Sequence, residues 1–173
     1  MKLLIITPAH RGSFSGNYTT AARIAWLLKK TAIRATVSDK FSQQDADVLL
    51  AIHADKSRHS IKRFHRVHPD RPLVVLLAGT DIHRTPLSDA CLKSLHLADR
   101  LVALQDRAIE RLPAVFQAKA ITILQSACPP ARPARPLQDS FEVAVVANLR
   151  AVKDPLRTAM AIRNLPSDLR VLV

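Results

Sequence analysis

The fold is decided by the stretch LVVLLAGTD, residues 73–81. Its apolar part, residues 73–78, is typical of a strand that is buried on both faces in the centre of a parallel sheet. Its polar end combines a glycine, a hydroxyl group and a carboxyl group in Gly79, Thr80 and Asp81. Ligands of open α/β sheets bind at the carboxyl ends of the strands. The stretch therefore predicts a central parallel strand whose end faces a ligand cleft.

Apolar segments and amphipathic patterns alternate on both sides of this stretch. Predicted strands lie at 2–7, 34–38, 47–52, 100–104 and 119–124, and predicted helices at 17–31, 55–68, 86–98 and 106–112. Asn17, Asp55 and Thr85 are the predicted N-caps of the first three helices. This alternation predicts an α/β fold with a Rossmann-like parallel sheet flanked by helices.

A proline-rich segment marks the predicted domain boundary. Residues 129–136 read PPARPARP, which favours an extended, semi-rigid linker. We therefore predict one domain over residues 1–126, a linker over 127–140 and the start of a second domain over 141–173. In that second domain we expect a strand at 142–147, a helix at 153–164 and a strand at 169–173. Because one β-α-β unit cannot close a core, we expect the second domain to be truncated.

Composition and charge restrict the function classes. The 26 Lys and Arg residues exceed the 14 Asp and Glu residues, which gives a net charge of +12. Such a field attracts anions, whether nucleic acid, anionic lipid or phosphorylated metabolites. The two cysteines, Cys91 and Cys128, lack metal-ligand spacing. The N-terminal apolar run is too short for a signal peptide, and no segment approaches the about 20 apolar residues of a membrane span. We expect a cytoplasmic protein without a membrane partner.

Four loops at the predicted strand ends carry candidate binding residues; the fourth carries Gln105, which the role of a helix-capping or solvent-facing amide explains equally well. The first contains Arg11, Gly16 and Asn17, where a helix N-terminus and a guanidinium group favour an anion. An ordinary strand-to-helix loop explains these residues equally well, and the Gly-x-Gly-x-x-Gly pattern of dinucleotide sites is absent. The second carries His53, which is either a functional group or a hydrogen-bonding neighbour of the next helix. The third is 79–81, where local turn chemistry is the alternative.

A further candidate lies in the second domain, where Arg150 and Lys153 follow a predicted buried strand and open a helix. A guanidinium fork and an ammonium group at a helix start suit a diphosphate. Two basic residues in a loop are common, however, and by themselves indicate only a solvated surface.

Other chemistry is not indicated. The basic helix around Lys62 lacks interleaved stacking aromatics, so a solvated face is the better interpretation than a nucleic-acid site. His65 and His68 have no third ligand nearby in the sequence, and we predict no metal site. No Ser-His-Asp order, nucleophile elbow or Walker loop occurs, and no residue is assigned a catalytic role.

Several of these segments together resemble one family. They are Ile5-Ile6-Thr7-Pro8-Ala9-His10-Arg11-Gly12-Ser13 with Gly16-Asn17, Ala51-Ile52-His53-Ala54, Pro69-Asp70-Arg71-Pro72-Leu73, Gly79-Thr80-Asp81, Ala98-Asp99-Arg100-Leu101-Val102 and Leu149-Arg150-Ala151-Val152-Lys153-Asp154-Pro155. The chain resembles the selenosugar synthases of selenoneine biosynthesis, a branch of the family 4 glycosyltransferases of the GT-B type. The resemblance spans essentially the whole chain.

The resemblance implies a fold and a reaction. The chain would hold the acceptor-side Rossmann-like domain of a GT-B fold and the opening of the nucleotide-sugar domain. Selenophosphate would attack the anomeric carbon of a UDP-sugar such as UDP-N-acetylglucosamine, without a metal or other cofactor. Arg150 and Lys153 match the family's diphosphate-binding pair. Arg11, Gly16 and Asn17 fall on its acceptor loop, and His53, Gly79, Thr80 and Asp81 line the acceptor side.

Two departures from the family pattern carry expectations of their own. Asn148 stands where the family usually has a small residue, and the paired-glutamate segment that binds the nucleotide sugar is not present before Val173. We therefore expect this chain alone to turn over poorly. Two alternatives remain: a GT-B enzyme with a sugar or lipid-linked acceptor, and a non-catalytic basic Rossmann-like module that binds nucleic acid.

Overall fold

The computed structural model describes residues 1–10, 12–13, 15–83, 85–133, 135, 144–146 and 151–163 of the chain. The chain divides into two compact units, Met1–Ser126 and Ala127–Val173. The first unit ends where the proline-rich linker is predicted to begin.

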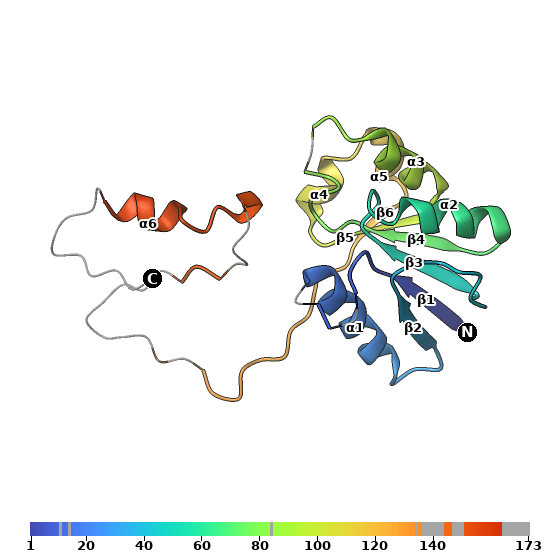
Figure 1. Cartoon of the computed structure of the whole chain (residues 1–173), viewed down its shortest axis with the longest axis horizontal. Coiled ribbons are helices and arrows are strands. Elements are labelled where there is room, and N and C mark those ends of the chain that lie inside the picture. The colour runs from blue at the N-terminus through green and yellow to red at the C-terminus, as the bar shows by residue number, and fades with distance from the viewer. Residues whose placement is uncertain are drawn as a thin grey trace. The chain divides into compact units, whose positions relative to one another are not determined.

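The first unit is built on a six-stranded parallel sheet with the order β2-β1-β3-β4-β5-β6 (Figure 1). The strands are β1 (Lys2–Ile6), β2 (Arg34–Ser38), β3 (Val48–Ile52), β4 (Leu73–Leu76), β5 (Arg100–Ala103) and β6 (Ala120–Thr122). The predicted α/β, Rossmann-like class is therefore confirmed. The order reverses direction after β1, because β2 lies on one side of it and β3 on the other.

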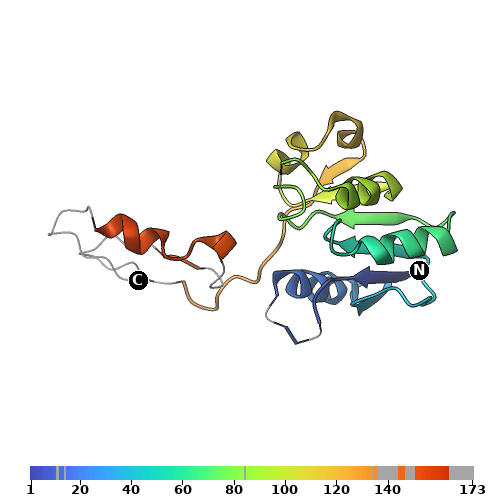
Figure 2. The ribbon, with the colours of Figure 1, turned by 45° about the horizontal axis from the view of Figure 1, so that its top comes forward.

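Helices cover both faces of this sheet. They are α1 (Gly16–Leu28), α2 (Arg58–Val67), α3 (Asp89–Leu97), α4 (Asp106–Glu110) and α5 (Ala114–Gln117). The core on one face joins strand residues to α2 and α3 through Ile61, Phe64 and Leu95. The core on the other face joins Ile5, Leu50 and Leu76 to α1. Figure 2 shows α1 on the opposite side of the sheet from α2 and α3.

The helices begin later or elsewhere than the sequence predicts. The N-cap of α1 is Ser15, so Asn17 lies inside the first turn and is not the cap. The N-cap of α2 is Ser57 and not Asp55, because residues 54–57 first form a turn in which Ser57 N–H donates to the His53 carbonyl. The N-cap of α3 is Ser88 and not Thr85.

The reason for the later start of α3 is a side-chain hydrogen bond. The Ser88 hydroxyl accepts a hydrogen bond from the Cys91 N–H at 3.1 Å. Such a bond satisfies a donor of the first turn that the helix itself leaves unpaired. The preceding predicted helical residues therefore stay in the connection between β4 and α3.

The second unit has little regular structure among its described residues. A 3₁₀ turn spans Ala151–Lys153 and helix α6 spans Arg157–Ile162. The predicted helix from residue 153 is interrupted because Asp154 has a φ of 44°, in the left-handed region that ends a helix. Residues 144–146, the described part of the predicted strand 142–147, form no strand. The predicted strand 169–173 lies outside the described residues.

In the described ranges, no helix is both long enough and apolar enough to span a bilayer.

Candidate functional site

The candidate site lies at the carboxyl edge of the sheet, where the strand order reverses between β1 and β3. In open α/β sheets the loops that leave such a reversal diverge to opposite faces and open a crevice for ligands. In this chain the loop after β1 leads to α1 on one face, and the loop after β3 leads to α2 on the other. The end of β4 lies beside the end of β3 in the same edge.

His53 follows β3 directly and is almost completely buried, with 3% of its surface exposed. Its backbone φ is 74°, a left-handed conformation that is uncommon for a residue other than glycine. Its N–H still donates to the Leu76 carbonyl of β4 at 2.8 Å, so the residue is anchored to the sheet. Its ring Nε2 lies 2.9 Å from Thr80 Oγ1. The imidazole thus bridges the ends of β3 and β4.

Burial lowers the pKa of His53 below its ordinary value. The Asp81 and Asp55 carboxylates oppose this change, whereas the Lys56 ammonium group adds to it. Because burial is the largest of these effects, the ring stays neutral at pH values where an exposed histidine begins to protonate.

Asp81 ties the two loops together from within. Its carboxylate accepts hydrogen bonds from Ala54 N–H at 2.9 Å and from Ala78 N–H at 3.0 Å. Its side chain has no exposed surface. Where β4 ends, the carboxylate thus takes the place of the carbonyl groups that would accept these hydrogen bonds within a sheet. Of the two interpretations that the sequence allows for Asp81, the geometry favours the structural one.

Thr80 and Gly79 present the exposed part of this corner. Thr80 is exposed, and Gly79 has a φ of 99°, which favours glycine at this position. The Gly79 carbonyl accepts hydrogen bonds from the Ile82 and His83 N–H groups, which closes a tight turn. Within the part of the chain that the structure describes, neither the Gly79 N–H nor the Thr80 N–H donates a hydrogen bond. We name residues 79–81 together with His53 the closed corner.

A hollow of about 160 Å³ adjoins Gly79. Its polar groups come from His83 and Gln105, and Ile82 and Leu104 supply apolar contacts. The His83 Nδ1 lies 3.1 Å from the Arg111 guanidinium. The hollow therefore has an amide group and a histidine that is linked to a cation at its rim. No sequence pattern indicates the His83–Arg111 pair, because the two residues meet only through the packing of α4 beside the end of β4.

A second, more open corner lies at the ends of β1 and β2. Its hollow measures about 490 Å³ and is lined by Thr7, Ala9, His10, Tyr18, Val37, Ser38 and Asp39. Here His10 Nδ1 lies 3.6 Å from an Asp39 carboxylate oxygen, and both side chains are largely in solvent. We name His10 and Asp39 with this hollow the open corner. Asp39, which directly follows strand β2, is not among the residues predicted from the sequence.

The predicted acceptor loop borders the open corner. Gly16 is the first residue of α1 and is exposed, and Asn17 is half-buried in the same turn. The first turn of α1 has no acidic residue and no side-chain cap, so its backbone N–H groups favour an anion. Arg11, the third predicted residue of this loop, lies outside the described residues.

The predicted diphosphate pair is described in part. Lys153 is exposed at the end of the 3₁₀ turn, and Arg150 lies outside the described residues. Lys153 does not open a helix as predicted, because α6 begins at Arg157. The Asp154 carboxylate pairs with the Arg157 guanidinium at 2.6 Å.

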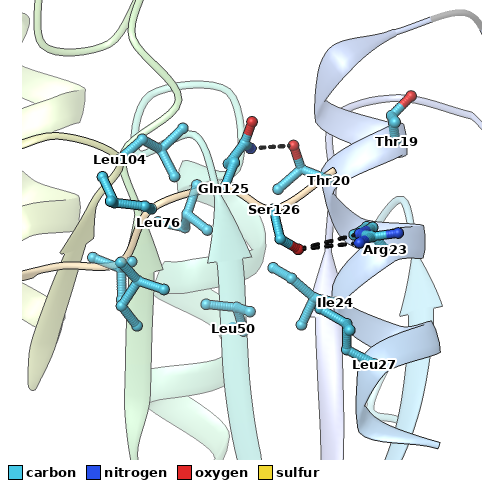
Figure 3. Close-up of a pocket in the computed structure, with 13 residues that line it drawn as sticks. Thr19, Thr20, Arg23, Ile24, Leu27, Leu50, Leu76, Leu104, Gln125 and Ser126 are labelled. Atoms are coloured by element: carbon cyan, nitrogen blue, oxygen red, sulfur yellow. Dashed lines mark hydrogen bonds between the residues drawn. The ribbon is translucent and has the colours of Figure 1, made fainter. Parts of the chain in front are cut away.

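An apolar groove of about 290 Å³ lies on the α1 face of the sheet (Figure 3). Leu50, Leu76 and Leu104 form its floor, and Ile24 and Leu27 of α1 form one wall. At its rim Gln125 Nε2 donates to Thr20 Oγ1 at 2.7 Å, and the Arg23 guanidinium donates to Ser126 Oγ at 3.2 Å. These bonds tie the end of the first unit to α1. The groove is lined mainly by apolar side chains and has few groups that could take part in a reaction.

The remaining reactive groups among the described residues include a buried cysteine and the exposed cations of α2. Burial, with smaller contributions from the Asp81 and Asp55 carboxylates, raises the pKa of the Cys91 thiol to about 12. The described ranges contain no group of three or more His, Cys, Asp or Glu residues placed to hold a metal ion. The basic helix α2 exposes His59, Lys62, Arg63 and Arg66 to solvent.

The comparisons with known proteins found no match: no protein-family model matches the chain, and no curated protein matches it.

Proposed function

We propose that the chain forms the acceptor-side part of a GT-B glycosyltransferase that transfers a sugar from a UDP-sugar to selenophosphate. The observation that carries the proposal is the Gly79–Thr80 turn after β4, one strand away from the strand-order reversal, with an exposed hydroxyl group and two backbone N–H groups that have no acceptor in the described part of the chain. Such donors suit the oxygen atoms of a small oxyanion. The choice of selenophosphate over other oxyanions comes from the sequence resemblance.

In the proposed reaction the protein only has to orient the substrates and supply positive charge. The selenium atom attacks the anomeric carbon, the C–Se bond forms, and the bond from that carbon to the UDP oxygen breaks with its electron pair leaving on UDP. Water then attacks phosphorus and the P–Se bond breaks. The products of this step are inorganic phosphate and a 1-selenosugar. The nucleophile is supplied by the substrate, so no protein nucleophile is required. In this proposal the N-terminal unit holds and orients the selenophosphate oxygens.

The high positive charge supports an anionic substrate pair. A net charge of +12 raises the local concentration of selenophosphate and UDP-sugar near the protein. Departing diphosphate in such enzymes is stabilised by basic side chains and helix N-termini. In this chain Arg150 and Lys153 are the proposed groups, on the basis of the family motif alone.

A second candidate function is supported by the exposed cations of α2. His59, Lys62, Arg63 and Arg66 lie on one helix and are exposed, which is the charge pattern of a surface that binds polyanions. In this case the chain is a non-catalytic module for nucleic acid. Such binding would weaken steeply with added salt and would not involve Thr80.

Product analysis by mass spectrometry separates the candidates. The chain is incubated with UDP-N-acetylglucosamine and either selenophosphate or a panel of sugar and lipid-linked acceptors. The proposal predicts a selenium-containing sugar and release of UDP only with selenophosphate, at the low rate expected of this chain alone. A carbohydrate or lipid acceptor that is preferred over selenophosphate would show that the acceptor assignment is wrong. Salt-sensitive nucleic-acid binding without any UDP release would favour the second candidate.

A further inference from the structure

The pairing of a buried histidine with an exposed threonine excludes one direction for the hydroxyl hydrogen of Thr80 in the closed corner. His53 is buried and Thr80 is exposed, yet His53 Nε2 and Thr80 Oγ1 lie 2.9 Å apart. The pair therefore links the interior of the β3–β4 connection to the surface at which a ligand arrives.

The hydrogen-bond network assigns the tautomer of His53. The Lys56 N–H donates to His53 Nδ1 at 3.2 Å, which occupies the lone pair of that nitrogen. A neutral imidazole has one N–H and one acceptor nitrogen, so the ring hydrogen must be on Nε2. The 3.8 Å separation of Nδ1 from the Asp81 carboxylate is too long for a competing hydrogen bond. Burial keeps the ring neutral, as described above.

The tautomer in turn decides what Thr80 can do. Since Nε2 carries the hydrogen, the ring donates to Thr80 Oγ1, and the Thr80 hydroxyl cannot direct its own hydrogen at the ring. Among the described residues no acceptor receives that hydrogen. Thr80 and its neighbour Gly79 also have backbone N–H groups without acceptors in the described part of the chain. All of these groups are donors, so the corner suits a ligand that carries hydrogen-bond acceptors.

We propose that Thr80 is an oriented hydroxyl donor to an anionic oxygen of the ligand, and that His53 is the positioning residue that directs the hydroxyl hydrogen to that oxygen. The inference rests on the proposed function only for the phosphate-type identity of the ligand. His53 acts through Thr80 and does not itself contact the ligand. Asp81 holds the two loops at the separation that the His53–Thr80 bond requires.

The inference is tested by phosphate affinity in a double-mutant cycle. Inorganic phosphate is the probe, and its binding to the whole chain is measured by isothermal titration calorimetry. Thr80→Val removes the donor and should weaken binding roughly tenfold or more, because hydrogen bonds to charged groups are among the strong ones. Thr80→Ser keeps the donor and should bind within about twofold of the parent. Thr36→Val, on the exposed edge strand β2, is the matched control and should leave affinity unchanged.

The histidine arm of the cycle shows whether His53 acts through Thr80. His53→Leu should weaken phosphate binding several-fold, and His53→Gln, whose amide N–H can replace Nε2–H, should restore most of it. In the Thr80→Val background, His53→Leu should have no further effect. Additive losses, or a Thr80→Val variant that binds phosphate like the parent, would overturn the proposal. Thermal unfolding of each variant identifies any loss of phosphate affinity that comes from misfolding. If Thr80→Val or His53→Leu misfolds, the phosphate affinities of Thr80→Ser and His53→Gln still test the proposal.

Two further measurements separate this inference from the proposed function. Nitrogen-15 NMR of the His53 ring should show Nε2 protonated and Nδ1 not, and the opposite pattern would contradict the assignment. If the tautomer and the phosphate affinities agree with expectation but no selenosugar forms, only the proposed function fails. If selenosugar forms and Thr80→Val leaves the KM for selenophosphate unchanged, only this inference fails.

Discussion

The closed and open corners each contain one aspartate and one histidine at nearly the same separation, but in opposite surroundings. His53 and Asp81 lie 3.8 Å apart with 4% and 0% of their side chains exposed. His10 and Asp39 lie 3.6 Å apart with 89% and 47% exposed. The closed pair is held by backbone donors from two loops, whereas the open pair is surrounded by solvent.

The distance between the two side chains alone does not decide the role of an Asp–His pair. In the open corner water screens both groups, so the pair contributes little to stability. In the closed corner burial makes each hydrogen bond necessary, because an unpaired buried group carries its full desolvation cost. The closed corner is therefore rigid and can orient an exposed neighbour, and the open corner can accept a range of ligands.

The largest expected difference between the corners is in the free energy of unfolding. Asp81→Ala leaves the Ala54 and Ala78 N–H groups without an acceptor, and should destabilise the first unit by about 3 kcal/mol. Asp39→Ala should change stability by less than about 0.5 kcal/mol, since that side chain is exposed. Urea unfolding followed by circular dichroism measures both variants. Equal losses in the two variants would show that the closed corner is not a structural tie.

A smaller difference in the free energy of unfolding is expected when a glycine of the closed corner and a glycine beside the open corner are each replaced by alanine. Gly79 has a φ of 99°, so Gly79→Ala should destabilise by about 1–2 kcal/mol through backbone strain. Gly16 begins α1 with a conformation open to other residues and with no atom within 4 Å of an added Cβ. Gly16→Ala should therefore be neutral or stabilising by up to about 1 kcal/mol. Thermal unfolding compares the two, and a larger loss for Gly16→Ala would contradict the backbone argument.

The smallest expected effect is the dependence of stability on pH. The pKa of His53 is lowered in the folded state, so between that pKa and the ordinary value of about 6.5 the unfolded chain binds more protons than the folded one. The folded state thus loses stability as the pH falls below about 6.5, by at most about 1.4 kcal/mol per pH unit, and keeps this stability above that pH.

The control for the pH effect is again the open corner. Urea unfolding of the parent at about pH 7.5 and about pH 5.5 should show a loss that His53→Gln removes and that His10→Gln leaves in place. A parent whose stability rises on acidification through this window, relative to His53→Gln, would mean that His53 is protonated in the folded state.

Much of the sheet was predictable from sequence because its strands are apolar runs of a length that suits strands. The run at 73–78 indicated a buried central strand, although β4 ends at Leu76 because the Ala78 N–H turns inward to Asp81. Helix starts were less predictable. Asn17, Asp55 and Thr85 are acceptable caps in isolation, and only the packed structure selects Ser15, Ser57 and Ser88 in their place.

The candidate site was predictable as a set of residues but not as a set of roles. His53, Gly79, Thr80 and Asp81 meet because they end neighbouring parallel strands, which the strand pattern alone indicates. Which of them is buried depends on the left-handed turn at His53 and on the backbone donors around Asp81. No local sequence pattern encodes either feature. Asp39 gave no signal because it follows a strand with no fully buried residue.

We infer that a small oxyanion binds at the Gly79–Thr80 turn. Two-dimensional proton–nitrogen NMR of the isotopically labelled chain, titrated with inorganic phosphate, tests it most directly. We expect the backbone amides of Gly79 and Thr80 to shift most, together with the Nε2–H of His53. Shifts confined to the exposed cations of α2 or to the open corner around Asp39, with the Gly79 and Thr80 amides unmoved, would contradict it.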